Sequence, residues 1–310
     1  MKRRKFISLA LISALEFLFT GKLQADEKKL NNSETKPDPS AWKDDEINIC
    51  WIGHATVLIN FYGSIILTDP VLFDNIGLYF FGLTFGQTRY TKPALNIDEI
   101  PRPDIVLISH AHMDHMDYKT LLNLTDRFPG QLDCITAYNT ADVIAELKWK
   151  TLTEMDWEDS VQIHGTNISA HKVKHFGWRY PWEKDRSRGY IKTGRSYNSY
   201  LIEKNGRKIY FGGDTAYIYR NQPEKLKNTD IVIMPIGAYR PWKKNHCNPE
   251  EALIMAKHQM NAEYFIPVHF YTFRLGTEPR DEPLKWLLDS APRFNLKISV
   301  TLPGGVLTVR

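Results

Sequence analysis

Short apolar runs separated by Gly, Pro and Asp follow one another from Ile47 to the end of the chain. Runs of this kind, rich in branched residues, are typical of strands that other layers of the protein cover. We expect strands at 47–52, 55–61, 64–68, 105–109, 161–163, 167–173, 197–203, 208–211, 230–236, 264–268, 297–302 and 306–309. The last two are expected to pair as a hairpin around Gly304 and Gly305.

Helices are expected between these strands, at 118–127, 140–148, 249–260 and 282–290. The first two follow the 3.6-residue period. The third has a clear start, because Asn248 can cap it, Pro249 fits its first position, and Glu250 and Glu251 suit its first turn. Strands that alternate with helices, without a long linker between them, predict one α/β domain over residues 47–310.

A weak similarity links the two halves of this domain. The apolar segment 66–68 ends in Asp69 and is followed by an apolar strand at 104–108. The segment 210–211 ends, after two glycines, in Asp214 and is followed by the strand at 230–234. Two similar α/β halves that face each other would bring strand-end residues of both halves to one rim. The alternative is a chance similarity of the kind that any α/β protein offers.

The first 25 residues have the composition of an export signal. A basic start at 2–5 precedes an apolar stretch over 6–20, and Ala25 supplies the small residue that a signal peptidase requires. The arginine pair in the basic start resembles a twin-arginine signal, while a general secretory signal and an uncleaved anchor are the alternatives. Residues 26–46 are polar, so we expect a flexible leader there and a mature protein that is exported to the periplasm.

Composition limits the classes of protein and of partner. A quarter of the 310 residues are charged and 43% are hydrophobic, which excludes a collagenous, disordered or multi-span membrane protein. The formal net charge of +4 lies in the first 25 residues, so the neutral body gives no reason to expect a nucleic-acid partner. Three cysteines form at most one disulfide within the chain, so the stability of a protein of this length must come from a buried core. Cys50, Cys134 and Cys247 either form one disulfide with one thiol left over or stay buried and unpaired.

The strongest chemical signal is the segment 109–115, with the sequence SHAHMDH, directly after the apolar strand that begins at residue 105. Three imidazoles and one carboxylate lie within six residues, and these groups are ligands of zinc and related first-row metals. In an extended segment His110, His112 and Asp114 share one face, and a turn at His115 would bring in a fourth ligand. The sequence therefore predicts a metal site at the end of this strand.

Two complete metal sites need further ligands, and the candidates lie elsewhere in the chain: His171, His175, Asp214, His246 and His269. Asp214 follows two glycines, which allow the backbone to turn tightly, and a carboxylate in that position can bridge two ions. His269 directly follows an apolar strand. His164 and His258 lack such a placement, and we expect them to be ordinary surface residues.

Several motifs together resemble the metallo-β-lactamase fold superfamily, whose signature is H-x-H-x-D-H followed by a single His, a single Asp and a final His. The resemblance is closer to one branch, the zinc hydrolases similar to N-acyl-phosphatidylethanolamine-hydrolysing phospholipase D. It extends from about residue 48 to residue 292 and rests on the segments WIGHAT (51–56), LTDP (67–70), GDTAY (213–217), PIGAY (235–239), NHCNPEEA (245–252), VHFYTF (268–273) and EPRDEP (278–283).

The resemblance implies a four-layer αβ/βα sandwich with two zinc ions, or iron or manganese in their place, at the rim of two sheets. The first zinc would bind His110, His112 and His175, the second would bind Asp114, His115 and His269, and Asp214 would bridge them. In the family, the third histidine ligand is usually followed by Trp, whereas His175 is followed by Phe176. His171 is therefore the alternative candidate for this ligand. The antibiotic-hydrolysing members of the superfamily typically have a Cys at the bridging position. This chain has Asp214 there, and Cys247 does not match that position, which argues against a true β-lactamase. The flavo-diiron members have an acidic residue at the position of His112, so the histidine argues against a redox site.

The resemblance also implies the chemistry. Two zincs would share a water and lower its pKa, so that hydroxide attacks a phosphorus or carbonyl carbon without a protein nucleophile. We assign catalytic roles to Asp114 and to His246, which matches a family position at the lip of the site and would bond a phosphate oxygen or protonate a leaving group. A surface histidine ahead of a helix is the alternative for His246. Asp69 is expected to orient a ligand histidine.

The family also suggests the substrate. We expect phosphodiester hydrolysis of the phospholipase D type on N-acyl-phosphatidylethanolamine-like phospholipids; the alternatives are hydrolysis of a lactone or another ester, and a non-catalytic, metal-dependent envelope protein. The aromatic segments 73–85 and 176–182 would line a lipid groove or rest on a membrane surface, or else form a packed lid or core. The expected partners are a small-molecule or phospholipid substrate and a peripheral membrane contact, without nucleic acid.

Overall fold

The computed structural model describes residues 36–219 and 222–310. The expected export signal and the first part of the expected leader, residues 1–35, lie outside these described residues. Over the part of the chain that is described, no helix is both long and apolar enough to cross a bilayer.

Residues 36–46, the rest of the expected leader, contact the domain. They include the short helix η1 (Pro39–Ala41), and the Lys36 ammonium pairs with Glu99. Glu46 is buried and accepts a hydrogen bond from Arg310 Nε at 3.0 Å. This part of the leader is therefore held against the body of the protein.

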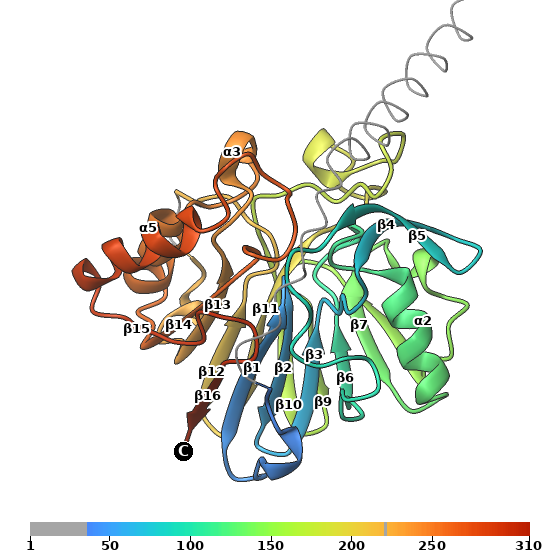
Figure 1. The fold of residues 1–310 in the computed structure, drawn as a ribbon, viewed down its shortest axis with the longest axis horizontal. Helices are drawn as coiled ribbons and strands as arrows, with labels where there is room; N and C mark the ends of the chain where they lie inside the picture. Colours follow the sequence, from blue (N-terminus) through green and yellow to red (C-terminus); the bar gives the residue numbers. More distant parts are fainter. Residues whose placement is uncertain (1–35, 220–221) are drawn as a thin grey trace, which may run out of the picture.

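Two seven-stranded mixed sheets form the centre of the molecule (Figure 1). The first contains, in spatial order, β16 (Val306–Val309), β1 (Ile47–Gly53), β2 (Thr56–Phe61), β3 (Ser64–Thr68), β6 (Ile105–Leu107), β7 (Asp133–Ala137) and β8 (Thr151–Met155). The second contains β15 (Lys297–Ile298), β14 (Tyr264–Val268), β13 (Ile231–Pro235), β12 (Arg207–Phe211), β11 (Asn198–Lys204), β10 (Thr166–Lys172) and β9 (Ser160–Ile163). A separate hairpin consists of β4 (Asn75–Phe80) and β5 (Leu83–Thr88).

Both sheets have the same internal pattern. In the first, β1, β2 and β3 pair antiparallel, and β3, β6, β7 and β8 pair parallel. In the second, β10, β11 and β12 pair antiparallel, and β12, β13, β14 and β15 pair parallel. The repeat confirms the similarity between the two halves. Asp69 and Asp214 follow β3 and β12, the strands at which each sheet changes from antiparallel to parallel pairing.

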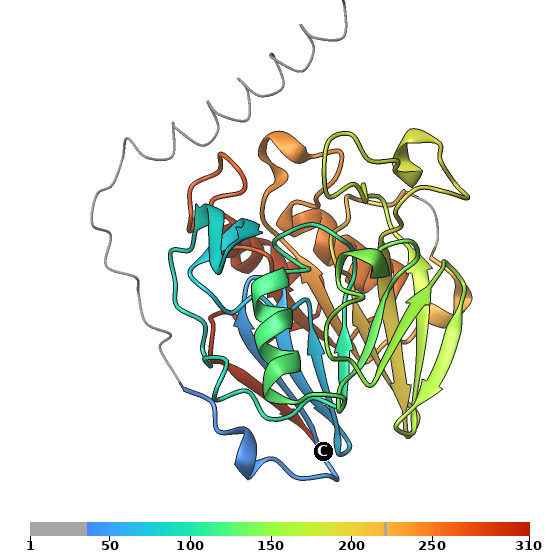
Figure 2. The same cartoon turned by 90° about the vertical axis from the view of Figure 1, so that its right-hand side faces the viewer.

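Helices cover the outer face of each sheet, which gives the four layers of an αβ/βα sandwich (Figures 1 and 2). On the first sheet lies α2 (Tyr118–Arg127), and on the second lie α4 (Pro249–Ile254), its π-helical continuation η5 (Met255–Gln259) and α5 (Glu282–Ser290). As expected, Asn248 caps α4, in a reciprocal capping box with Glu251. The other helices are short: η2 (Ala141–Val143), η3 (Arg186–Arg188), η4 (Glu224–Leu226), α3 (Tyr239–Trp242) and η6 (Ala291–Arg293).

Side chains on β1 alternate between two cores, as the period of a strand requires. Ile49 and Trp51 belong to the core between the two sheets, whereas Cys50 and Ile52 belong to the core under α2. All three cysteines are buried and unpaired, so no disulfide forms and the second of the two expected alternatives holds.

The helix predicted over 140–148 is wrong, because only the single turn η2 forms there. The backbone N–H groups of Thr140 and Ala141 both donate to Glu154 Oε1 at 2.7 Å. The Trp149 indole donates to the carbonyl of Ile144 at 3.0 Å, so a carbonyl that a longer helix would use has another partner. Side chains outside the segment thus compete with the helix that its periodicity predicts.

The hairpin predicted at the C-terminus is also wrong. β15 adds to β14 in parallel in the second sheet, whereas β16 adds to β1 in antiparallel in the first. The turn between them crosses from one sheet to the other, where the Gly304 N–H donates to the Trp51 carbonyl at 2.8 Å. Each segment completes the open edge of a different sheet, which no local turn signal reveals.

Candidate metal centre

The expected ligands come from both sheets and meet at one edge. The segment 110–115 follows β6, His175 follows β10, Asp214 follows β12 and His269 follows β14. An isolated bridge between His110 and Tyr197 links the loop after β6 to the second sheet. This is the shared rim that the internal similarity predicted.

The first group of potential ligands consists of His110, His112, His175 and Asp214, whose ligand atoms all lie within 4.8 Å of one another. His112 Nδ1 lies 2.7 Å from His110 Nε2 and 3.2 Å from His175 Nε2. The other ring nitrogen of His112 is buried and has no hydrogen-bond partner among the described residues. Nitrogen atoms therefore converge here as they do around a metal ion.

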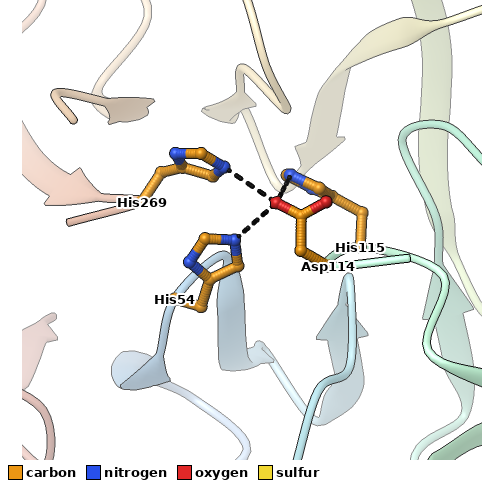
Figure 3. Close-up of side chains that lie close together, drawn as sticks. All are labelled: His54, Asp114, His115 and His269. Carbon is orange, nitrogen blue, oxygen red and sulfur yellow. Dashed lines mark hydrogen bonds and ion pairs between the residues drawn. The ribbon is translucent and has the colours of Figure 1, made fainter. Parts of the chain in front are cut away.

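The second group consists of His54, Asp114, His115 and His269 (Figure 3). Three imidazoles surround a single carboxylate oxygen, Asp114 Oδ2. The Nε2 atoms of His54, His269 and His115 lie 2.9, 3.3 and 3.4 Å from it. Asp114, which we expect to bind metal and to be catalytic, is thus the centre of this group.

Asp214 connects the two groups. Its Oδ2 lies within 4.0 Å of a ring nitrogen of five histidines: His115 (3.1 Å), His269 (3.2 Å), His175 (3.7 Å), His246 (3.8 Å) and His110 (4.0 Å). Its Oδ1 is buried and has no hydrogen-bond partner among the described residues. Gly213 has a φ of +54°, and a Cβ on it would lie 2.6 Å from Ser109 Cβ, so a glycine is needed for this close approach. The carboxylate is placed where it can bridge two ions.

His246, expected at the lip of the site, forms a third group with Asp214 and His269. It is 7% exposed, which rules out the alternative of an ordinary surface histidine. Burial lowers the pKa of His246 to about 3, so its imidazole is neutral near pH 7. A neutral imidazole can donate a hydrogen bond to a phosphate oxygen, which agrees with the first of its two expected roles. Protonation of a leaving group would need the imidazolium form, which the lowered pKa disfavours.

Burial and the mutual proximity of these groups set their protonation. Burial lowers the pKa of His110 and His112 well below the usual value, and the neighbouring imidazoles lower it further. Burial raises the pKa of Asp114 and Asp214, but the surrounding histidines outweigh this, and the pKa of both ends well below the usual value. Burial lowers the pKa of His115, but the carboxylates around it raise it well above the usual value. The cluster thus combines neutral imidazoles, which can bind a metal ion, with ionised carboxylates. A metal ion can replace the proton that His115 holds between these carboxylates.

Hydrogen bonds from outside the cluster orient three of its histidines, and the first of these bonds joins His110 Nδ1 to Ser109 Oγ at 2.8 Å. Asp69 is fully buried and accepts from the Ser109 N–H at 2.7 Å, from the Ser109 hydroxyl at 2.6 Å and from His115 Nδ1 at 2.6 Å. His175 Nδ1 donates to the carbonyl of Asn245 at 3.0 Å. Each bond keeps the proton on Nδ1 and leaves the Nε2 lone pair for the centre. The geometry agrees with the orienting role expected of Asp69.

The donor set of the cluster fits first-row divalent metals. It offers imidazole nitrogens and carboxylate oxygens without a thiolate, which suits zinc and its neighbours. A set this rich in nitrogen does not suit magnesium or calcium, which prefer oxygen. Two ions, one in each group with Asp214 between them, would use all the expected ligands.

The remaining histidines lie away from the cluster. His171 is part of β10, and its Nε2 lies 3.0 Å from Ser169 Oγ, outside all three groups. The geometry therefore favours His175 over His171 as a ligand. His164 pairs with Asp133 at 2.8 Å, and His258 is exposed.

His54 is the member of the cluster that was not predicted from the sequence. It follows β1 directly and belongs to the WIGHAT segment. The available signal was its position at a strand end, which it shares with His269. A single sequence does not tell which strand ends reach the common rim.

Known proteins resemble this chain in sequence and in fold. The family model described as beta-lactamase superfamily domain matches residues 65–270. N-acyl-phosphatidylethanolamine-hydrolyzing phospholipase D 1 of Caenorhabditis elegans is 31% identical over 280 residues, which cover 82% of this chain and 73% of the relative. The mitochondrial N-acyl-phosphatidylethanolamine-hydrolyzing phospholipase D of Saccharomyces cerevisiae is 30% identical over 269 residues, 79% of this chain and 53% of the relative. Igni18, a metallo hydrolase of Ignicoccus hospitalis, superposes with a TM-score of 0.59 at 16% identity, over 86% of this chain and 99% of the other.

The fold, the cluster of His and Asp side chains and the matching family together define a metal-dependent hydrolase. The chain belongs to the metallo-β-lactamase superfamily, in the branch that contains the N-acyl-phosphatidylethanolamine-hydrolysing phospholipases D. The resemblance predicted from the motifs is confirmed. The alternative of a non-catalytic envelope protein is thereby dropped.

Proposed function

We propose that the protein is a phosphodiesterase of the phospholipase D type, which hydrolyses N-acyl-phosphatidylethanolamine-like phospholipids at a centre of two zinc ions. Its relatives in C. elegans and S. cerevisiae are named for this reaction. The observation that carries the proposal for this chain is a cationic cavity beside the candidate metal centre.

This cavity, of about 360 Å³, is lined by His269, Arg274, Arg280 and the rings of Tyr90, Phe270, Tyr271 and Phe273. The Arg280 guanidinium lies 3.9 Å from the centroid of the Tyr271 ring and donates to Thr91 Oγ1 at 2.8 Å. Its Nε is buried and has no hydrogen-bond partner among the described residues. Glu278, the carboxylate in the wall, accepts from the backbone N–H groups of Ala238 and Arg240.

These contacts favour an anionic substrate. A phosphodiester carries a negative charge at neutral pH, whereas a lactone is uncharged. A guanidinium binds phosphate oxygens with paired, charge-assisted hydrogen bonds. Because Arg274 and Arg280 line the cavity and the cavity borders His269, a phosphodiester fits it better than an uncharged lactone does.

The residues of the cluster have separate tasks in the proposed reaction. His110, His112 and His175 would hold one ion, Asp114, His115 and His269 the other, and Asp214 both. Bound zinc supplies Lewis acidity and a water that is activated near neutral pH. Asp114 keeps its negative charge and so offsets the positive charge of the centre. His246, as a neutral imidazole, would donate a hydrogen bond from its ring N–H to a phosphoryl oxygen.

The β4–β5 hairpin supports the lipid part of the proposal. It exposes a series of large apolar side chains: Phe81 (88%), Phe80 (62%), Leu83 (61%), Phe85 (50%) and Leu78 (46%). Trp182, in the second aromatic segment, is 79% exposed and lines one surface depression together with Phe80 and Phe81. The hairpin lies at the same end of the molecule as α3, which directly follows Ala238 in the wall of the cationic cavity (Figures 1 and 2). An exposed apolar patch marks a binding surface, and this one suits acyl chains or the surface of a bilayer.

The two aromatic segments differ in their packing. The apolar residues at the tip of the hairpin are exposed, so they do not form part of a packed core. Phe176 and Trp178 instead pack on His112, with ring centroids 4.3 and 6.1 Å away, so they form part of the wall of the candidate metal centre.

Hydrolysis assays on zinc-loaded protein test the proposal. The substrates are N-acyl-phosphatidylethanolamine in vesicles, bis(p-nitrophenyl) phosphate and an uncharged lactone. We expect faster cleavage of both phosphodiesters than of the lactone. Arg280→Met should raise KM for the phosphodiesters about 10- to 100-fold, because a hydrogen bond to a charged group contributes about 1.5–3 kcal/mol.

The matched control is Arg293→Met, which removes a surface ion pair with Glu250 and should leave every KM unchanged. The same Arg280→Met protein should hydrolyse the lactone as the wild type does. If the lactone is the best substrate, or if Arg280→Met weakens all three substrates equally, hydrolysis of lactones or other esters replaces the phosphodiester proposal.

We also propose that the protein is exported to the periplasm, on the strength of the signal-like residues 1–25. N-terminal sequencing of protein from fractionated cells tests this. A chain that begins near residue 26 in the periplasmic fraction is expected. An intact Met1 on protein from the cytosol would overturn it.

A further inference from the structure

His54 has an unusual backbone conformation at the end of β1. Its φ of +53° lies in the left-handed region, which costs free energy for a residue with a side chain. Three hydrogen bonds maintain it: its N–H donates to Thr272 Oγ1 at 2.8 Å, and its carbonyl accepts from Trp51 Nε1 at 2.7 Å and from the His269 N–H at 3.0 Å. A strained residue persists only where the surrounding structure fixes it, and such residues concentrate at functional sites.

The imidazole of His54 points into the second group of ligands (Figure 3). Its Nε2 lies 2.9 Å from Asp114 Oδ2, and its ring packs against the rings of His269 and Phe273, with centroids 4.1 and 5.2 Å away. The side chain is 1% exposed, and Nδ1 has no hydrogen-bond partner among the described residues. Asp114 is therefore the polar partner that accounts for an imidazole, rather than an apolar ring, at this position.

We propose that His54 is a positioning residue of the metal centre: it donates its Nε2–H to Asp114 Oδ2 and so fixes this carboxylate in the orientation that binds the second metal ion. A carboxylate that is already oriented loses less conformational freedom when the ion binds. Asp114 is only 15% exposed, and a hydrogen bond to a carboxylate that is largely removed from water is stronger than one in water. The proposal rests on the metal centre of the proposed function and not on its substrate.

Zinc binding to the metal-free, full-length protein tests the role of His54. The protein is titrated with Zn²⁺ in competition with a chromophoric chelator, which gives the affinity for each equivalent. His54→Asn removes the contact with Asp114 but tolerates the left-handed backbone, because Asn is enriched there. We expect one of the two zinc equivalents to bind roughly 10- to 100-fold more weakly in this variant.

Two further variants separate positioning from packing. His54→Gln carries an N–H donor at about the reach of Nε2 and should return the affinity to within about threefold of the wild type. His171→Asn alters another histidine that is 1% exposed but lies outside the cluster, and both affinities should stay unchanged. Wild-type affinities in His54→Asn, or equally weak binding by His54→Gln and His54→Asn, would overturn the proposal.

A measurement on the wild-type protein covers the case in which His54→Asn fails to fold, as circular dichroism would show. Nitrogen NMR of the zinc-loaded protein should find a proton on His54 Nε2. An unprotonated, zinc-bound Nε2 would make His54 a direct ligand and overturn the positioning role. Neither experiment measures hydrolysis, so a failure of the proposed phosphodiesterase activity would remain distinguishable from a failure here.

Discussion

Asp69→Asn measures how strongly the metal centre depends on a residue that does not itself face the ions. Asp69 is fully buried and accepts hydrogen bonds from two groups of Ser109 and from His115 Nδ1. The substitution keeps the size of the side chain but removes its charge and turns one oxygen into an NH₂ donor. An amide donor that faces Nδ1 would force the proton of His115 onto Nε2, where the metal is expected.

The size of the effect follows from the contact that is lost. A hydrogen bond to a charged group contributes about 1.5–3 kcal/mol. Each 1.4 kcal/mol corresponds to roughly a tenfold change in an equilibrium constant, so zinc affinity at the second group should fall about 10- to 150-fold. The loss of about 10- to 100-fold that is typical of residues behind a metal ligand is of the same order.

Chelator competition on the metal-free protein is the assay, and the apparent affinity of the weaker zinc equivalent is the quantity compared. Asp133→Asn is the matched control, because Asp133 has a buried carboxylate that pairs with Lys150 and His164 instead of with the cluster. Wild-type zinc affinity in Asp69→Asn would refute the reasoning. So would an equal loss in Asp133→Asn, since the effect would then come from general destabilisation.

Four further outcomes are expected. Asp214→Asn should release at least one metal ion, seen by elemental analysis, and lower activity by roughly 10²-fold or more, whereas near wild-type turnover would show that Asp214 does not bridge. His175→Ala should lower the metal content and His171→Ala should not; the reverse would exchange their assignments. Because burial lowers the pKa of His171 to about 4, below its unfolded value near 6.5, stability should fall as pH drops from 6.5 to 4, and His171→Leu should flatten that fall in urea unfolding. Replacing Phe80 and Phe81 together by Ser should slow cleavage of long-chain vesicles more than of short-chain diesters, and an equal effect on both would argue against a lipid-binding hairpin.

Local signals predicted much of the fold. The strands around β1 were visible because their apolar residues face two cores, and the start of α4 because Asn248 and Glu251 lie close in sequence and cap it. The SHAHMDH segment likewise concentrates four of the expected ligands in one loop. Each of these features depends on neighbours along the chain.

What could not be predicted depends on distant partners. Glu154 captures the amides of Thr140 and Ala141, which prevents the helix expected there. β15 and β16 join different sheets because each sheet offers an open edge, and the strands β4, β5, β7 and β8 were not predicted at all. His54 reaches the cluster only through the pairing of β1 in the finished sheet and its bonds to Thr272 and His269.

The metal content of the protein decides whether the cluster is a two-ion centre. Protein purified without chelator is analysed for first-row metals by elemental analysis, against a protein concentration measured independently. Seven expected ligands, joined by Asp214 into one largely buried cluster, predict close to two ions per chain, mainly zinc. A folded protein that hydrolyses its substrate while it contains no metal would contradict the assignment.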